Sequence, residues 1–171
     1  MIRLLDRFLG RLDHLSARAS LGLHSLGVYV GLPALVVLVS LDVLLRYVFD
    51  SPLAWSRDAN GLLLLFTLFS CLPHAWDRGY HIRMEILYSR MSRKAQEIVD
   101  VLTGLAGVVF AATIGIQSLR FVPFMMAVGE TGEDLLIPLW PFMGFMALAS
   151  FVFAARVLSN PRGDEEEGGW L

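Results

Sequence analysis

The residues that could do chemistry in this chain are four histidines, one cysteine and a few acids near long apolar segments. His24 and His74 lie close to the ends of two of these segments, so a helical bundle could bring their rings face to face. Paired imidazoles can ligate a haem iron from its two sides. One alternative prediction is therefore a b-type haem membrane anchor that uses His24 and His74. The other interpretation is a pair of interfacial histidines that contact headgroups or carbonyl groups.

Other site chemistry finds no support in the sequence. The single cysteine, Cys71, lies within an apolar segment, which excludes an internal disulfide framework and a cysteine-based metal cluster. No nucleophile–base pair, phosphate-binding glycine loop or metal-ligand spacing is present, and the basic residues form no patch for nucleic acid. We therefore expect no enzyme activity, no cofactor, no metal site and no nucleic-acid partner in this chain.

Long apolar segments dominate the chain, so they must form the structure that positions any functional residues. Hydrophobic residues make up 56% of its 171 residues. A bilayer core about 30 Å thick needs roughly 20 apolar residues per helix, and the chain supplies four such stretches. The sequence predicts an all-α integral membrane protein whose domain 19–158 holds four transmembrane helices, at about 24–45, 55–76, 97–119 and 136–158.

The two ends of the chain differ from this domain. Residues 1–18 place leucines and Phe8 at helical spacing beside several arginines, a pattern that predicts an amphipathic interfacial helix. A cleaved signal peptide is disfavoured because no apolar run of seven residues is present there. Residues 159–171 are polar, acidic and glycine-rich, which predicts a disordered tail.

Small residues in two of the expected spans indicate close helix packing. Gly27 and Gly31 form a G-x-x-x-G pair, although two glycines could also fall at this spacing by chance. Gly107, Ala111 and Gly115 form a longer ridge at spacing four, which is the better packing signal.

A short connection between the first two spans reads RYVFDSPLAWSRD, residues 46–58. Asp42 and Arg46 lie four residues apart and share one helix face, so we expect an ion pair. Asp50 and Ser51 are typical N-cap residues, and Pro52 suits the first turn of the next helix. The stretch is predicted to be a tight turn at a membrane surface.

Basic residues are distributed unevenly about the four spans. Eleven of the 14 lysines and arginines lie before the first span, between the second and third, or at the end of the fourth. The positive-inside rule then places both termini in the cytoplasm.

The middles of the expected spans contain no ionisable residue. A charge at the bilayer centre costs about 2.5–3.5 kcal/mol on insertion scales, so its presence usually marks a transport pathway. A self-sufficient small transporter, acting as a homodimer, is the second alternative, and it would need such a residue.

Several motifs resemble, in order and spacing, the small membrane subunit of tripartite ATP-independent periplasmic (TRAP) transporters. The matching segments are Arg46-Tyr47-Val48-Phe49 with Pro52, Leu53 and Trp55-Ser56; Arg78 with His81-Ile82; and Ile137-Pro138-Leu139-Trp140. Arg57-Asp58 stands where the family often has paired acids, and Cys71-Leu72-Pro73-His74 where it is often rich in glycine and alanine.

The resemblance implies a non-catalytic scaffold subunit in a bacterial inner membrane. Its partners would be a large transport subunit, a periplasmic solute-binding protein and membrane lipids, and the complex would take up an organic acid driven by an ion gradient. Coupling sodium would bind in the large subunit. The residues expected at the partner interface are Asp42, Arg46, Trp55, Asp58, His81, Pro138 and Trp140.

Overall fold

The computed structural model describes residues 2–78 and 91–159 of the chain. Its helices are α1 (Ile2–Leu26), the π-helical turn η1 (Gly27–Gly31), α2 (Leu32–Val48), α3 (Ser56–Asp77), α5 (Arg93–Val128) and α6 (Trp140–Ser159). Four helical segments in this part of the chain are long and apolar enough to cross a membrane: Asp13–Val48, Ser56–Asp77, Arg93–Val128 and Trp140–Ser159. The prediction of an all-α membrane protein with four spans is confirmed.

The first span and the segment before it form one continuous helical rod. The backbone runs from α1 through η1 into α2, and the N–H of Leu32 donates to the carbonyl of Gly27, five residues earlier. Pro33 explains the wide turn, because a proline has no N–H to donate to the carbonyl four residues before it. The placement of residues 1–18 in the membrane interface stays a prediction.

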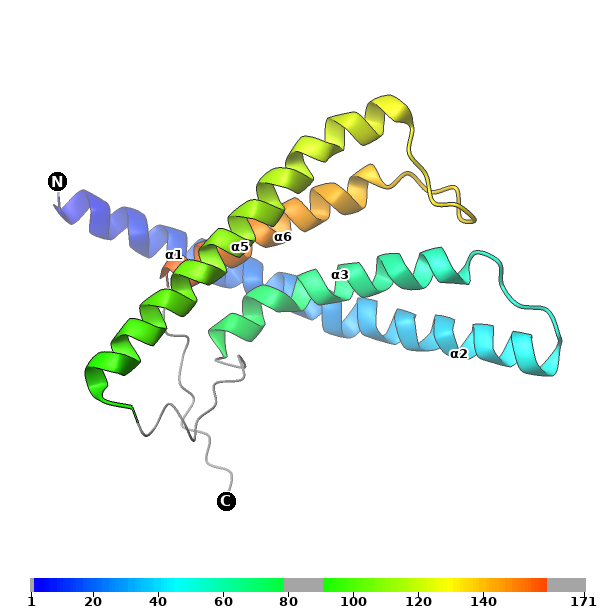
Figure 1. The fold of residues 1–171 in the computed structure, drawn as a ribbon, viewed down its shortest axis with the longest axis horizontal. Coiled ribbons are helices and arrows are strands. Elements are labelled where there is room, and N and C mark those ends of the chain that lie inside the picture. The colour runs from blue at the N-terminus through cyan, green and yellow to red at the C-terminus, as the bar shows by residue number, and fades with distance from the viewer. Residues whose placement is uncertain (1, 79–90, 160–171) are drawn as a thin grey trace, which may run out of the picture.

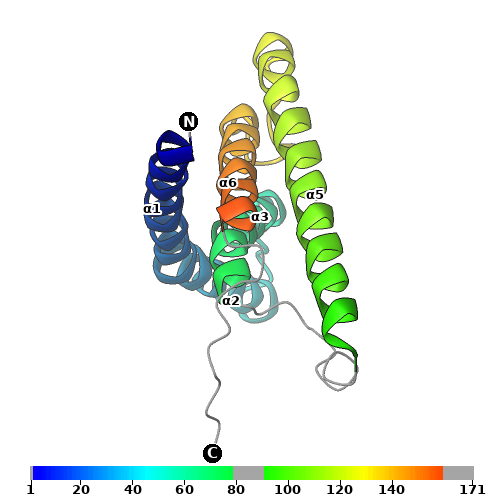
Figure 2. The same cartoon turned by 90° about the vertical axis from the view of Figure 1, so that its left-hand side faces the viewer.

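The helices are arranged as two pairs that share one end. Helix α2 packs on α3 and α5 packs on α6, and the two pairs diverge towards the end that holds the turns 49–55 and 129–139 (Figure 1). At the opposite end α1 contacts both α3 and α6. Seen from that end, α6 lies between α1 and α5 (Figure 2).

The buried apolar core lies at the closed end, between α3, α5 and α6. It contains Trp76, Ala111, Phe153 and Val157, and the rings of Trp76 and Phe153 meet edge to face with centroids 5.8 Å apart. Along the ridge of small residues on α5, Ala111 is buried, and a Cβ at Gly107 would meet the indole at an ordinary van der Waals distance of 3.5 Å. The ridge of small residues on α5 is therefore a helix-packing face, as predicted.

The connection between α2 and α3 differs from the expected tight turn. Helix α3 begins at Ser56, and its N-cap, Trp55, makes no side-chain capping bond. The prediction that Asp50 and Ser51 cap this helix with Pro52 in its first turn is wrong. Asp50 instead adopts a positive φ of 49°, and the N–H of Ser51 donates to the carbonyl of Leu45, 3.1 Å away, which closes the end of α2.

Candidate functional site

The carboxylate of Asp42 organises the turn between α2 and α3. One of its oxygens accepts a hydrogen bond from Nη2 of Arg46 at 2.7 Å, and the other accepts one from the backbone N–H of Leu53 at 3.1 Å. Asp42 is buried, whereas the side chain of Arg46 is 52% exposed. Asp42 therefore holds the turn against α2. The guanidinium of Arg46 has further N–H groups, which can face outward.

Asp58 holds a second connection at the same end of the molecule. Its Oδ2 accepts hydrogen bonds from the backbone N–H groups of Asp134 and Leu135, at 2.9 and 3.3 Å. Gly132 lies against the same oxygen, which a Cβ there would approach to 2.7 Å. The first residues of α3 are thereby tied to the loop before α6, which bridges the two diverging helix pairs (Figure 1).

Three more residues expected at the partner interface, Trp55, Pro138 and Trp140, lie on or beside these two connections. Trp55 and Trp140 are each 39% exposed, and Pro138 forms an isolated bridge with Thr131 in the loop that Asp58 binds. His81 falls outside the described residues, as does the tail from residue 160 onward. The structure thus gathers Asp42 with Arg46, and Asp58 with the loop that holds Pro138. Their role towards a partner stays a prediction.

Four polar residues, which we call the Arg156 cluster, lie at the opposite end of the bundle. Arg156 donates from Nε to Oδ1 of Asp77 at 2.6 Å and from Nη1 to Oδ1 of Asp13 at 2.7 Å. The hydroxyl of Ser20 donates to the other oxygen of Asp77 at 2.9 Å. The arginine and Asp77 side chains are only 7% and 11% exposed. The cluster joins α1, α3 and α6 through charge-assisted hydrogen bonds.

This cluster is absent from the residues singled out in the sequence. Asp77 ends the second span and Arg156 lies near the end of the fourth, at matching depth if both ends face the same side. Because Asp77 and Arg156 have opposite charges and lie at the same depth, the sequence alone could have suggested that they pair. The third partner, Asp13, could not be inferred because its helix was expected to lie on the membrane surface.

His24 and His74 do meet, as the haem alternative requires, but in a different geometry. Their ring centroids are 4.2 Å apart and the ring planes are inclined by 33°. Imidazoles that ligate one haem iron from its two faces must enclose the porphyrin between them. Rings stacked this closely leave no space for a porphyrin, so the residues do not fit a haem site.

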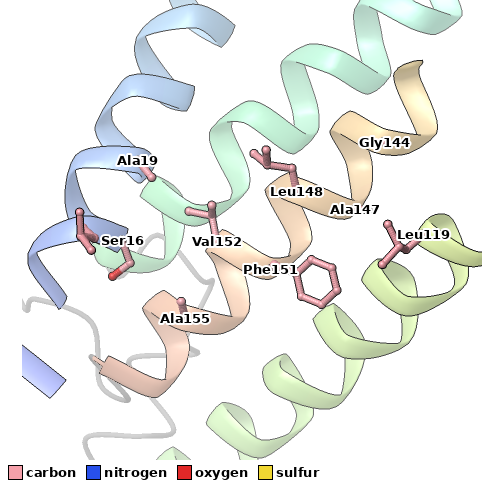
Figure 3. Close-up of a pocket in the computed structure, with 10 residues that line it drawn as sticks. Ser16, Ala19, Leu119, Gly144, Ala147, Leu148, Phe151, Val152 and Ala155 are labelled. Carbon is pink, nitrogen blue, oxygen red and sulfur yellow. The ribbon is translucent and has the colours of Figure 1, made fainter. Parts of the chain in front are cut away.

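An apolar groove of about 520 Å³ runs along α6 between α1 and α5 (Figure 3). Ala19 from α1, Leu119 from α5 and Phe151 from α6 line it, with small residues of α6 forming part of its floor. Its single hydroxyl-bearing residue, Ser16, already donates to the carbonyl of Asp13. The groove therefore presents no group for polar chemistry.

Comparisons with known proteins identify the family. A family model described as Tripartite ATP-independent periplasmic transporters, DctQ component, matches residues 35–163 of the 171-residue chain. Neither curated proteins nor solved structures yield a match. The family match includes both connections described above, together with α3, α5 and α6. The chain therefore belongs to the DctQ component family of tripartite ATP-independent periplasmic transporters.

Proposed function

We propose that this chain is the non-catalytic small permease subunit that braces the large transport subunit of its TRAP system. The complex would lie in a bacterial inner membrane and use an ion gradient, with sodium bound in the large subunit, to take up an organic acid. A periplasmic binding protein would deliver the acid. Family membership supports the general role, and the bracing role follows from the distribution of charge in the chain.

The observation that carries this proposal is the position of the Asp42 and Arg156 ion pairs at the two ends of the bundle. In the described residues, Asp42 and Arg46 pair at one end, and Arg156 pairs with Asp13 and Asp77 at the other. Between them the helix pairs meet through apolar contacts, such as the stacked rings of Phe66 and Phe145 with centroids 4.7 Å apart. An ion or carboxylate crossing here would lose its hydration without gaining a partner.

Such a chain suits a stationary role. In transporters that work by alternating access, a moving element needs a fixed one to move against. Charged clusters at both ends tie α1, α2, α3 and α6 into one body. The solute and ion sites would then lie in the large subunit.

The same proposal includes an orientation in which both termini face the cytoplasm, on the grounds of the basic-residue distribution. In a Cys71→Ser background, Ser51→Cys and Thr131→Cys should react with an impermeant thiol reagent added outside spheroplasts, and Ser89→Cys should not. Thr131 is exposed, whereas a side chain at Gly132 would strike Asp58. Labelling of Ser89→Cys without labelling of the other two variants would show that the orientation is the reverse of the one proposed.

Uptake by reconstituted proteins tests the bracing role. Liposomes that hold only this chain should accumulate no dicarboxylate or sialic acid under an inward sodium gradient, because residues 2–78 and 91–159 place their ion pairs at the ends of the bundle and apolar contacts between them. Liposomes that also hold the large subunit, with the binding protein outside, should accumulate the solute of that binding protein. Gradient-driven uptake by this chain alone would make it a self-sufficient transporter and refute the proposal.

The turn between α2 and α3 is the proposed contact with the large subunit. Arg46→Ala removes outward donors and strands the buried Asp42, and Trp55→Ala removes a large amphipathic side chain of the kind that dominates interfaces. Each substitution should reduce recovery of the large subunit with the tagged chain in mild detergent by about tenfold or more, equivalent to about 1.4 kcal/mol of binding. Arg162→Ala, in the tail, is the control with no expected effect. Full recovery in both turn variants would place the interface elsewhere.

A further inference from the structure

Two polar side chains of α5 face away from the rest of the chain, within its apolar span. Gln117 and Arg120 are both exposed, and neither has a hydrogen-bond or ion-pair partner in residues 2–78 and 91–159. Gly115 packs against α6, and two further residues turn a helix by about 200°, so Gln117 lies on the opposite side. Figure 2 shows α5 at the edge of the bundle, where another helix can reach that side.

The depth of these two residues follows from the packing of α5 on α6. A Cβ at Gly115 would lie 3.4 Å from atoms of Ser150 and Phe151, which are at the middle of the 20-residue helix α6. At 1.5 Å per residue α6 is about 30 Å long, which matches the apolar core of a bilayer. Gln117 therefore lies about 3 Å from the middle of the membrane, and Arg120 about 7.5 Å, towards the end that holds the loop 129–139.

Hydrocarbon offers these two groups nothing to bind. A carboxamide at the depth of Gln117 has no water within reach of its short side chain, whereas Arg120 can extend towards the headgroups. Polar side chains inside membrane spans usually face protein, where they form hydrogen bonds across helices. The exposed position of Gln117 therefore indicates that another membrane protein covers this face of α5.

The same face has the spacing of a helix-packing seam. Its exposed residues follow one another at steps of three and four, the repeat with which one helix packs along another. We call this set the α5 seam: Phe110, Thr113, Gln117, Arg120 and Phe124. The hydroxyl of Thr113 already donates to the carbonyl of Val109 at 2.8 Å. Gln117 and Arg120 are thus the seam residues that can hydrogen-bond a partner.

We propose that the α5 seam docks a transmembrane helix of the large subunit, which presents a carboxylate to Arg120 and a hydrogen-bonding group to Gln117. The inference rests on the proposed function, because that function supplies the large subunit. It adds a second contact to the one proposed at the turn between α2 and α3.

Charge and depth select this occupant of the seam. A guanidinium within a membrane span needs an anionic or carbonyl partner. In a symmetric parallel pair of copies of this chain, equivalent residues meet at the same depth, so Arg120 would face another arginine. A lipid phosphate lies at the membrane surface, out of reach of Gln117. A helix of the large subunit can meet both side chains at their own depth.

Photo-crosslinking in membranes that contain the whole transporter tests where the large subunit lies. A benzophenone side chain replaces Phe110 or Phe124, so Gln117 and Arg120 stay in place. Both positions should form adducts with the large subunit. The matched control is the same probe at Leu119, which is 56% exposed but lines the groove on the other side of α5, and it should form none.

Substitutions test the chemistry of the contact. Gln117→Leu and Arg120→Leu should each lower recovery of the large subunit with the tagged chain by about threefold or more. Arg120→Glu should lower it further, because two carboxylates then face each other. Leu119→Ala is the control and should not change recovery. Neither leucine variant should lower the unfolding midpoint of the isolated chain, since both side chains are exposed.

The outcomes separate this proposal from the function on which it rests. Suppose that the unchanged chain recovers the large subunit, but the seam forms adducts with lipid alone or with a second copy of the chain. That result would overturn the docking site and leave the proposed function standing. Equal recovery with Arg120→Leu and Arg120→Glu would exclude the facing carboxylate. Failure of the unchanged chain to recover any large subunit would contradict the proposed function, and the docking site with it.

Discussion

Replacing Arg156 with alanine should destabilise the chain by about 3–5 kcal/mol, which is the usual cost of removing one partner from a buried ion pair. The side chain is 7% exposed and lies 2.6 Å from Asp77, itself 11% exposed. Without the guanidinium, the carboxylate of Asp77 loses its charged donor and keeps the hydroxyl of Ser20. The measurement is the midpoint of thermal unfolding in mild detergent.

Two further variants separate this effect from a general loss of positive charge. Arg120→Ala removes an exposed arginine on α5 and should change stability by less than about 0.5 kcal/mol. Adding Asp77→Leu to an Arg156→Met chain should restore part of the lost stability, since an apolar pair leaves no buried charge unpaired. If Arg156→Ala unfolds at the same temperature as Arg120→Ala, the cluster is not holding the helices together.

The spans could be predicted because membrane helices leave a strong signal in one dimension. Four apolar stretches of sufficient length are visible in the sequence, and hydrocarbon allows few structures other than helices. The pairing of Asp42 with Arg46 was equally accessible, since residues four apart on a helix are neighbours. The ends of the helices were harder to predict from the sequence. Hydrophobicity marks where a span leaves the membrane, but a helix can continue into water as long as its backbone hydrogen bonds continue. Helix α5, for example, continues past Arg120 to Val128.

Contacts between distant segments explain what the sequence could not reveal. The Arg156 cluster joins residues that are 79 and 143 positions apart, and no periodicity encodes such a meeting. Asp58 was assigned to a partner interface, but its carboxylate binds the loop 129–139 of its own chain. The sequence showed that Asp58, Asp77 and Arg156 are charged and lie near the ends of membrane spans. It could not show which of several polar groups at that depth would be their partners.

The glycine pair in the first span carries the second large prediction. Gly31 lies against α3, where a Cβ would overlap Oγ1 of Thr67 and approach Cδ1 of Phe66 to 3.2 Å. Gly27 packs on Ser70 in the same manner. A Cβ added at Gly27 would lie only 2.7 Å from the Cβ of Ser70. The G-x-x-x-G spacing therefore reflects packing and not chance.

Gly31→Leu should thus lower the stability of the chain by about 1–3 kcal/mol or more, because the added side chain must push α2 away from α3. The matched control is Gly22→Leu, on the same rod, where nothing lies within 4 Å of the added Cβ. Since both changes add the same side chain to a helix, their difference in unfolding midpoint isolates the packing effect. Thr67→Ala should partly rescue Gly31→Ala, because the threonine hydroxyl, fixed by its bond to the carbonyl of Leu63 at 2.8 Å, is the atom in the way. Equal midpoints for Gly31→Leu and Gly22→Leu would mean that α2 does not depend on this contact with α3.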